Sequence, residues 1–188
     1  LGDKYKISWN EHLSLYDGLK TNQKLEMLSE KKGLEIKDHK KIWNKKQKIT
    51  LKKLSQLKPS RKLKSIMKIL IKDGYRIAVC SNSIRMTVET VLSKLDIVDF
   101  VELVISNEDV KNSKPHPEMY WNAMSLMSCL PEETLIIEDS PYGLLAAARS
   151  KSFILRVKNT QEVTLNNIKN KLNNINMGEQ KIIPAWRD

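Results

Sequence analysis

Residues 135–143, LIIEDSPYG, place two adjacent carboxylates, Glu138 and Asp139, directly after a short apolar run. A short apolar run of this kind, closed by Ser-Pro and Gly, is typical of a strand buried in a parallel sheet. Two acids at the end of such a strand repel each other and lose solvation, which is costly unless a divalent cation or a lysine compensates. Hard oxygen ligands favour Mg²⁺, which keeps several waters and binds one or two protein carboxylates. The stretch therefore predicts a strand that ends at a magnesium site.

The sequence on both sides of this stretch alternates between strand-like and helix-like segments. The strand-like segments are 76–80 (RIAVC), 100–105 (FVELVI), 134–138 (TLIIE) and 153–157 (FILRV). The helix-like segments are 61–72, 84–94, 118–127 and one that includes 146–148. This alternation predicts an α/β fold, a Rossmann-like parallel sheet with helices on both faces. Ligands of such sheets bind beyond the carboxyl ends of the strands.

The beginning and the end of the chain have a different character. Residues 1–58 are predicted to be entirely helical, with spaced Leu, Ile and Trp in 22–31 and 38–56. The pattern changes at Lys58-Pro59-Ser60, and Ser60 is a candidate N-cap for the next helix. The chain is therefore divided into a helical unit, 1–58, and an α/β unit, 59–188. Its polar, Asn-rich tail, 166–188, predicts one helix and a loose end.

Composition sets limits on location and partners. With 188 residues, 40% apolar and 29% charged, the chain is globular rather than disordered. It has no apolar run of about 18 residues, so no membrane partner is expected, and its first residues lack the apolar core of a secretory signal. Cys80 and Cys129 have no CxxC spacing, and Cys80 ends an apolar strand-like run. A buried free thiol is therefore expected at Cys80, with a disulfide as the alternative, and a free thiol suits a cytoplasmic protein.

The net charge of +11 is concentrated in one region. Residues 31–72 contain sixteen Lys or Arg but only two acids, Glu35 and Asp38. A solvated helix face explains this, and so does a patch that attracts phosphorylated small molecules. Nucleic-acid binding is a third interpretation, but no aromatic-rich strand or zinc-ligand pattern supports it, and no nucleic-acid partner is expected.

Two further strand ends carry polar side chains. Ser81-Asn82-Ser83 follows the first strand and suits a phosphate or carboxylate, although Ser and Asn also cap helices. Lys114 follows the second strand, and Pro115-His116-Pro117 hold it in a stiff turn. A rigid lysine there neutralises a phosphate or restrains a carboxylate, unless it is simply a solvent-facing loop residue.

Taken in order, the three strand ends carry Ser, then Lys-Pro, then Glu-Asp. The blocks IAVCSNS, SNEDVKNSKPHPEMY and LIIEDSPYGLLAAA resemble the haloacid dehalogenase superfamily of aspartate-dependent phosphohydrolases. The resemblance runs from about Gly18 to Val157 and is strongest to the branch containing beta-phosphoglucomutase and sugar-phosphate phosphatases. It implies a Mg²⁺-dependent phosphatase or phosphomutase acting on a small phosphorylated metabolite.

The resemblance also implies roles for particular residues. Ser81 and Asn82 would bind the phosphate, and Lys114 would steady both the nucleophile and the transferring phosphate. Glu138 and Asp139 would be the acids of the Mg²⁺ site, with Asp139 favoured as the direct ligand.

The helical unit corresponds in this resemblance to most of an α-helical cap that closes over the substrate. Within YDGLKT, Lys20 and Thr21 fall where this branch has a substrate-facing loop. Lys151 stands where the family usually has the glycine of a left-handed helix end, which predicts a strain of about 1 kcal/mol. A monomer is expected.

The family's nucleophile motif, an apolar strand ending in Asp-x-Asp-Gly-Thr/Val, does not occur in this sequence. Residues 13–18 (LSLYDG) look like a degraded copy, but the preceding ISWNEHL is polar and helix-like, unfit for a central buried strand. In the family the motif strand lies between the strands that here end at Cys80 and Glu138. The sequence is therefore interpreted as an N-terminally truncated, inactive fragment. The alternative is a non-catalytic relative that keeps the site for binding or regulation.

Overall fold

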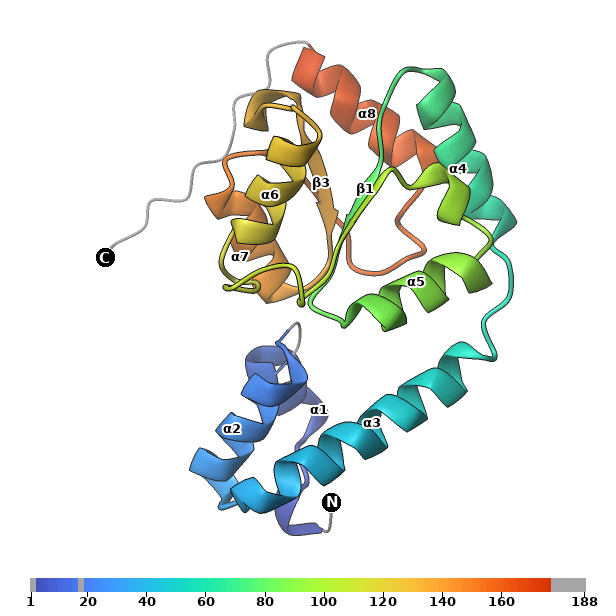
Figure 1. Ribbon diagram of the computed structural model, residues 1–188. Coiled ribbons are helices and arrows are strands. Elements are labelled where there is room, and N and C mark those ends of the chain that lie inside the picture. Colours follow the sequence, from blue (N-terminus) through green and yellow to red (C-terminus); the bar gives the residue numbers. More distant parts are fainter. Residues whose placement is uncertain (1–2, 17–18, 177–188) are drawn as a thin grey trace.

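The computed structural model describes residues 3–16 and 19–176 of the chain, so Gly18 and the end of the predicted tail lie outside the described residues. Figure 1 shows an α/β unit with a smaller helical unit beside it, and the segment 55–60 joins the two. No helix in the described ranges is both long enough and apolar enough to cross a membrane.

The helical unit is built from three helices and several single turns. The helices are α1 (Trp9–Glu11), α2 (Thr21–Lys32) and α3 (His39–Leu54), with a π-helical turn at His12–Tyr16 and 3₁₀ turns at Asp3–Tyr5 and Ile36–Asp38. Helix α2 ends at Gly33, whose φ of 66° lies in the left-handed region that glycine adopts without strain. The unit packs around four buried side chains: Tyr16, Leu25, Leu28 and Leu34. Residues 9–16 are therefore helical, as expected, and not a strand.

The α/β unit follows the predicted alternation. Its elements are α4 (Arg61–Lys72), β1 (Ala78–Cys80), α5 (Arg85–Lys94), β2 (Leu103–Ile105), α6 (Glu118–Leu126), β3 (Leu135–Glu138), α7 (Pro141–Arg149), β4 (Phe153–Arg156) and α8 (Leu165–Asn176), with 3₁₀ turns at Val98–Phe100 and Pro131–Glu133. Ser60 caps α4 as predicted, since its hydroxyl accepts a hydrogen bond from the Leu63 N–H at 3.3 Å.

The strands pair in parallel, but in two separate sheets. Strand β1 pairs with β2, with Ala78 opposite Leu103, and β3 pairs with β4, with Leu135 opposite Phe153. All four strands are shorter than predicted, β3 and β4 by one residue each. The predicted strand 100–105 is shorter because its first residue closes the 3₁₀ turn at Val98–Phe100, and residues 76 and 77 precede β1.

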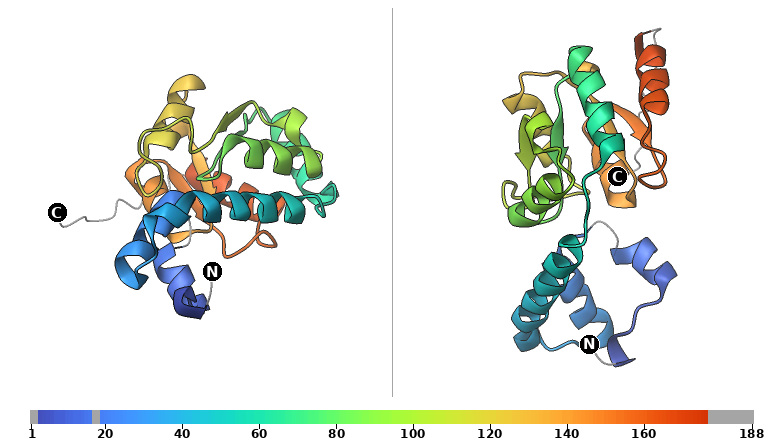
Figure 2. Two further views of the ribbon diagram at one scale, coloured as in Figure 1. Left: turned by 60° about the horizontal axis from the view of Figure 1, so that its bottom comes forward. Right: turned by 90° about the vertical axis from the view of Figure 1, so that its right-hand side faces the viewer.

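Side chains alternate between the two faces of the strands. Cys80 and Ile105 point into a core shared with α6 and α7, whereas Val79 and Val104 point toward α4 and α5. Helices therefore cover both faces, as the sequence predicted, and Figure 2 shows the strands between them.

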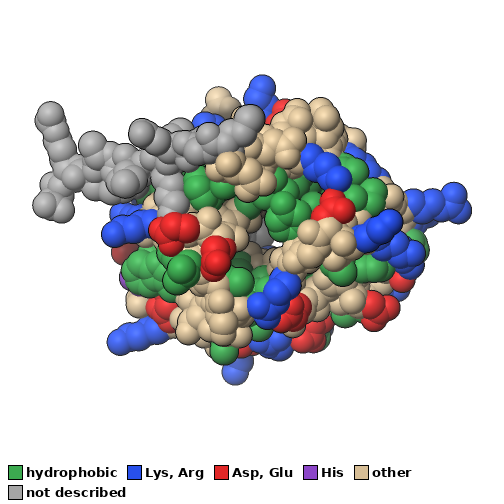
Figure 3. All heavy atoms as spheres, turned by 90° about the horizontal axis from the view of Figure 1, so that it is seen from above, with side chains coloured by type: hydrophobic (Ala, Val, Ile, Leu, Met, Phe, Trp, Pro, Cys, Tyr) green, Lys and Arg blue, Asp and Glu red, His purple; other side chains and the backbone are tan. Residues whose placement is uncertain are grey.

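The inner strands β1 and β3 are less buried than central strands of a doubly covered sheet normally are. All three residues of β1 are only half-buried, and Ile137 in the middle of β3 is 37% exposed. Viewed from the end away from the helical unit, the surface is hollowed near its centre, with hydrophobic side chains beside the hollow (Figure 3). The facing edges of β1 and β3, here called the inner edges, are not paired with each other in the described ranges.

Candidate active site

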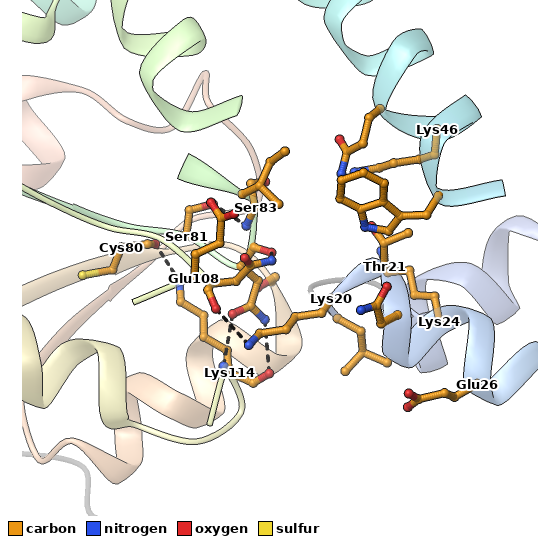
Figure 4. A pocket seen from close by; sticks show the side chains of 18 of the residues that line it. Lys20, Thr21, Lys24, Glu26, Lys46, Cys80, Ser81, Ser83, Glu108 and Lys114 are labelled. Atoms are coloured by element: carbon orange, nitrogen blue, oxygen red, sulfur yellow. Dashed lines mark hydrogen bonds between the residues drawn. The ribbon is translucent and has the colours of Figure 1, made fainter. Parts of the chain in front are cut away.

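A cavity of about 1250 Å³ lies between the helical unit and the carboxyl ends of β1 and β3 (Figure 4). One wall, here called the core wall, contains Ser81, Asn82, Lys114, Glu138 and Asp139, all predicted from the sequence. The opposite wall, here called the cap wall, comes from the start of α2 and one face of α3. Lys20 and Thr21, the predicted substrate-facing residues, belong to that wall. The fold therefore brings all seven predicted residues to one cavity.

Lys114 joins the two sheets at this end of the molecule. Its ammonium donates to the Cys80 carbonyl at the end of β1, at 3.1 Å, and to Glu138 Oε2 at the end of β3, at 2.6 Å. The side chain also lies over the Tyr120 ring, with Nζ 4.8 Å from the ring centroid. Lys114 is only 7% exposed, so the alternative of a solvent-facing loop lysine is wrong.

The Glu138 carboxylate accepts five hydrogen bonds. Oε2 accepts from Lys114 and from the Tyr120 hydroxyl at 2.9 Å. Oε1 accepts from the backbone N–H of Asp139 at 3.1 Å and from the N–H and hydroxyl of Ser140 at 3.1 and 3.0 Å. Burial works to raise the pKa of Glu138, but the Lys114 ammonium and these donors hold that pKa well below its usual range. Glu138 is therefore an anion at neutral pH that fixes the position of Lys114.

Gly143 makes room for this arrangement. A Cβ at Gly143 would lie 2.1 Å from the Glu138 carboxyl carbon, so the carboxylate occupies the space that any other side chain would fill. Sequence reasoning missed the roles of Gly143 and Tyr120. Both lie inside the quoted blocks, but only the direction of the Glu138 side chain shows what they do.

Asn82 pairs with the backbone of Lys114 in both directions. Its Oδ1 accepts from the Lys114 N–H at 3.1 Å, and its Nδ2 donates to the Lys114 carbonyl at 3.2 Å. The Asn82 carbonyl in turn accepts from Asn107 Nδ2 at 2.8 Å. Asn107, which sequence reasoning also missed, thus connects the loops that follow β1 and β2.

Ser81 stands at the mouth of β1. Its N–H donates to the Ile105 carbonyl at 2.9 Å, and its hydroxyl accepts from the Ser83 N–H at 3.1 Å. Ser81 therefore stabilises the local turn through its hydroxyl, as Ser often does. Ser81 also lines the cavity, where a phosphate could reach it. Its role as a phosphate ligand stays a prediction.

Lys20 crosses the cavity from the cap wall. Its ammonium donates to the Asn107 carbonyl at 3.0 Å, as the dashed line in Figure 4 shows. A second bond between the two units runs from the Tyr142 hydroxyl to the Leu15 carbonyl at 3.3 Å. Thr21 starts α2 and lines the cavity without reaching across it in this way.

The acidic side chains at this cavity differ in how well they suit Mg²⁺. No group of three or more His, Cys, Asp or Glu side chains gathers as a metal site among the described residues. Both Glu138 oxygens already accept hydrogen bonds, whereas Asp139 is exposed at the cavity. A single carboxylate plus waters is a normal Mg²⁺ arrangement, so Asp139 fits the ion and Glu138 fits a supporting position.

Cys80 is unsuited to nucleophilic chemistry. Burial raises the pKa of its thiol to about 11, although Lys114 works in the opposite direction. The thiol therefore stays protonated at neutral pH and behaves as a packing group.

Comparison with known proteins gives the family of this chain. A family model described as haloacid dehalogenase-like hydrolase matches residues 2–157. The chain belongs to this family. Its resemblance to the family, expected from three strand-end blocks, is thereby confirmed.

Individual curated relatives match a shorter segment of the chain than the family model does. Pyrophosphatase PpaX of Bacillus mycoides (strain KBAB4) is 40% identical over 78 residues, which is 40% of this chain and 35% of the relative. The matched segment thus spans about a third of the length of that curated relative.

Solved structures extend the fold comparison. The beta-phosphoglucomutase (pgmB) of Clostridium difficile gives a TM-score of 0.77 at 19% identity, over 92% of this chain and 85% of the other. A hydrolase from Pseudomonas syringae gives 0.71 at 17% identity, over 93% and 85%. At these identities the likeness shows the fold alone, an α/β unit with a helical cap.

Proposed function

We propose that this chain carries the cap and most of the core of a Mg²⁺-dependent phosphohydrolase acting on a small phosphorylated metabolite through an aspartyl-phosphate. The observation that carries the proposal is the Lys114 ammonium, bound to the Cys80 carbonyl at 3.1 Å and to Glu138 at 2.6 Å. A buried cation fixed at the ends of two strands is placed to balance charge on a phosphoryl group. The proposed organisation is a cap, 1–58, and a core, 59–188.

The nucleophilic carboxylate would come from a strand between β1 and β3. The backbone N–H and C=O groups on the inner edges of β1 and β3 could pair with such a strand, since neither edge pairs with another described strand. Ile137, in β3, is 37% exposed. A carboxylate at the carboxyl end of such a strand would lie near Lys114, whose ammonium binds at the ends of β1 and β3. Its oxygen would attack phosphorus while the substrate oxygen leaves with a proton from an adjacent acid, and water would then cleave the aspartyl-phosphate.

The chain's own residues would bind and orient the phosphoryl group. Ser81 would donate its hydroxyl to a phosphoryl oxygen, and Asn82 would hold the Lys114 loop in register with the Ser81 loop. Asp139 would hold Mg²⁺, which when bound supplies positive charge at the equatorial oxygens. The free thiols Cys80 and Cys129 suit the proposed cytoplasmic location.

The proposal is tested by supplying the strand. An apolar strand ending in Asp-x-Asp-Gly-Thr, fused by a flexible linker ahead of residue 1, should produce Mg²⁺-dependent hydrolysis of p-nitrophenyl phosphate. The same fusion ending in Asn-x-Asp is the matched control, and the unfused chain should release no phosphate.

Three results would count against the proposal. They are hydrolysis by the unfused chain, equal hydrolysis by both fusions, or no hydrolysis by the aspartate fusion once circular dichroism shows that it is folded. Lys114→Ala and Asp139→Asn in the active fusion should abolish turnover and leave the domain folded.

A further inference from the structure

Asn107 uses three of its polar groups to join separate parts of the site. Its carbonyl accepts from the Lys20 ammonium at 3.0 Å, its N–H donates to the Ser83 carbonyl at 3.1 Å, and its Nδ2 donates to the Asn82 carbonyl at 2.8 Å. Figure 4 shows the Lys20 side chain extended from the cap side toward the core side of the cavity. The helical unit and the loop that follows β1 are therefore both bonded to this one residue of the loop that follows β2.

The peptide group between Asn107 and Glu108 is held on both sides. Its carbonyl accepts from Lys20, and its N–H donates to the Ser106 hydroxyl at 3.1 Å. Ser106 is fully buried, and its own N–H and hydroxyl donate to Asp109 Oδ2 at 2.7 and 2.6 Å. The Ser106 side of this peptide is thus fixed in the core, whereas the Lys20 side depends on the position of the helical unit. A hydrogen bond from an ammonium is stronger than one between neutral groups, so its loss frees the peptide to rotate.

A rotation of this peptide would reach Lys114 through Asn82. The Asn107 side chain moves with its own backbone, and the carbonyl that it holds belongs to Asn82. Asn82 Oδ1 accepts from the Lys114 N–H at 3.1 Å, and Asn82 Nδ2 donates to the Lys114 carbonyl at 3.2 Å. Hydrogen bonds linked in this way polarise one another, so weakening one weakens the next. Four hydrogen bonds therefore make a continuous path from Lys20 to the Lys114 backbone.

We propose that Asn107 is a positioning residue that couples the binding of Lys20 on the core to the position of Lys114. With Lys20 bound, Asn107 holds Asn82. Asn82 then holds the Lys114 backbone where its ammonium meets its partners at the ends of β1 and β3. With the helical unit displaced, the Lys114 N–H opens to solvent more often. The catalytic meaning of this coupling rests on the proposed function, because that function places Lys114 at the phosphoryl group.

The test measures amide hydrogen exchange in the whole chain by NMR. Exchange of the Lys114 amide reports how often its bond to Asn82 opens. Lys20→Met should speed this exchange by about fivefold or more. The matched control, Lys46→Met, removes an ammonium from the same cavity at a residue outside this path, and it should leave the Lys114 exchange within about twofold of wild type.

The variant Asn107→Leu shows whether the effect passes through Asn107. Leu keeps the approximate shape of the side chain but cannot donate to the Asn82 carbonyl. In this background, Lys20→Met should change the Lys114 exchange by less than about twofold. The Phe153 amide, at the amino end of β4 and outside this path, should exchange at an unchanged rate in every variant.

Turnover gives a second measurement. In the active aspartate fusion, Asn107→Leu should lower kcat per folded molecule by about tenfold and change KM by less than about twofold. The reason is that Lys114 would act on the phosphoryl group during transfer, whereas Ser81 would already bind it in the ground state.

Each outcome decides the coupling or the proposed function. An unchanged Lys114 exchange in Lys20→Met overturns the coupling, and so does an equal gain in Lys46→Met, because the effect would then be general charge. An equal gain at Phe153 also overturns it, because the whole fold would then be looser. An undiminished effect of Lys20→Met in the Asn107→Leu background removes Asn107 from the path. Exchange needs no turnover, so an inactive aspartate fusion overturns the proposed function while the exchange rates still decide the coupling. An unchanged kcat in the active fusion overturns the positioning role alone.

Discussion

At the scale of single residues, the Glu138 carboxylate decides how the site is organised. It accepts from Lys114 and Tyr120 through one oxygen and from Ser140 through the other. A helical Gly→Ala replacement usually stabilises a protein by up to about 1 kcal/mol. Gly143→Ala should instead destabilise this one by about 1–3 kcal/mol, because the new Cβ would displace a buried, hydrogen-bonded carboxylate. Urea denaturation measures the change.

A double-mutant cycle gives this prediction its control. In the Glu138→Ala background the space beside Gly143 is free, so Gly143→Ala should become neutral or stabilising. The same destabilisation in both backgrounds would show that the helix, and not the carboxylate, needs the glycine.

The acid stability of the protein should depend on the same carboxylate. The pKa of Glu138 is held below its unfolded value of about 4.3. Its contribution to the free energy of unfolding is therefore present above pH 4.3 and is lost as pH falls toward the lower folded pKa. Urea midpoints between pH 6 and pH 2.5 should fall less steeply for Glu138→Gln than for wild type. Parallel curves would mean that Glu138 has an ordinary pKa.

At the scale of elements, the end of α7 stores a small strain. Lys151 follows the helix with φ of 63°, so the left-handed position expected from the sequence is confirmed. Lys151→Gly should raise the free energy of unfolding by about 0.5–1 kcal/mol, because glycine adopts this conformation without a Cβ clash. Lys151→Ala removes the same charge but keeps the Cβ, so it should give no comparable gain. Thermal unfolding of the two variants distinguishes strain from charge.

The same scale shows what the sequence could predict. Helices 61–72 and 84–94 and the strand before Asp139 follow from apolar spacing, caps and turn residues, which act locally. Five of the predicted site residues, Ser81, Asn82, Lys114, Glu138 and Asp139, meet because they follow the ends of parallel strands. The bond from Lys20 to Asn107 depends instead on how the cap sits on the core, and no local pattern carries that information.

At the scale of the whole molecule, hydrogen bonds help to hold the helical unit over the cavity. Two hydrogen bonds join the units, from Lys20 to the Asn107 carbonyl and from the Tyr142 hydroxyl to the Leu15 carbonyl. Each is worth about 0.5–1.5 kcal/mol. The Lys20→Met/Tyr142→Phe double variant removes about 1–3 kcal/mol in all and should therefore shift the balance toward an open arrangement by about 5- to 160-fold. Small-angle X-ray scattering should show a larger radius of gyration, while circular dichroism should show unchanged helix content.

The matched control removes a lysine and a hydroxyl that make neither bond. Lys31→Met/Tyr75→Phe changes the same residue types at exposed positions, so it should leave the radius of gyration unchanged. If the two double variants scatter alike, other contacts, such as those where α3 passes α5, hold the cap in place. Closure of the helical unit over the core would then not depend on the Lys20 hydrogen bond, and the proposed roles of Lys20 would be limited to contacting substrate and holding Asn107 in the cavity.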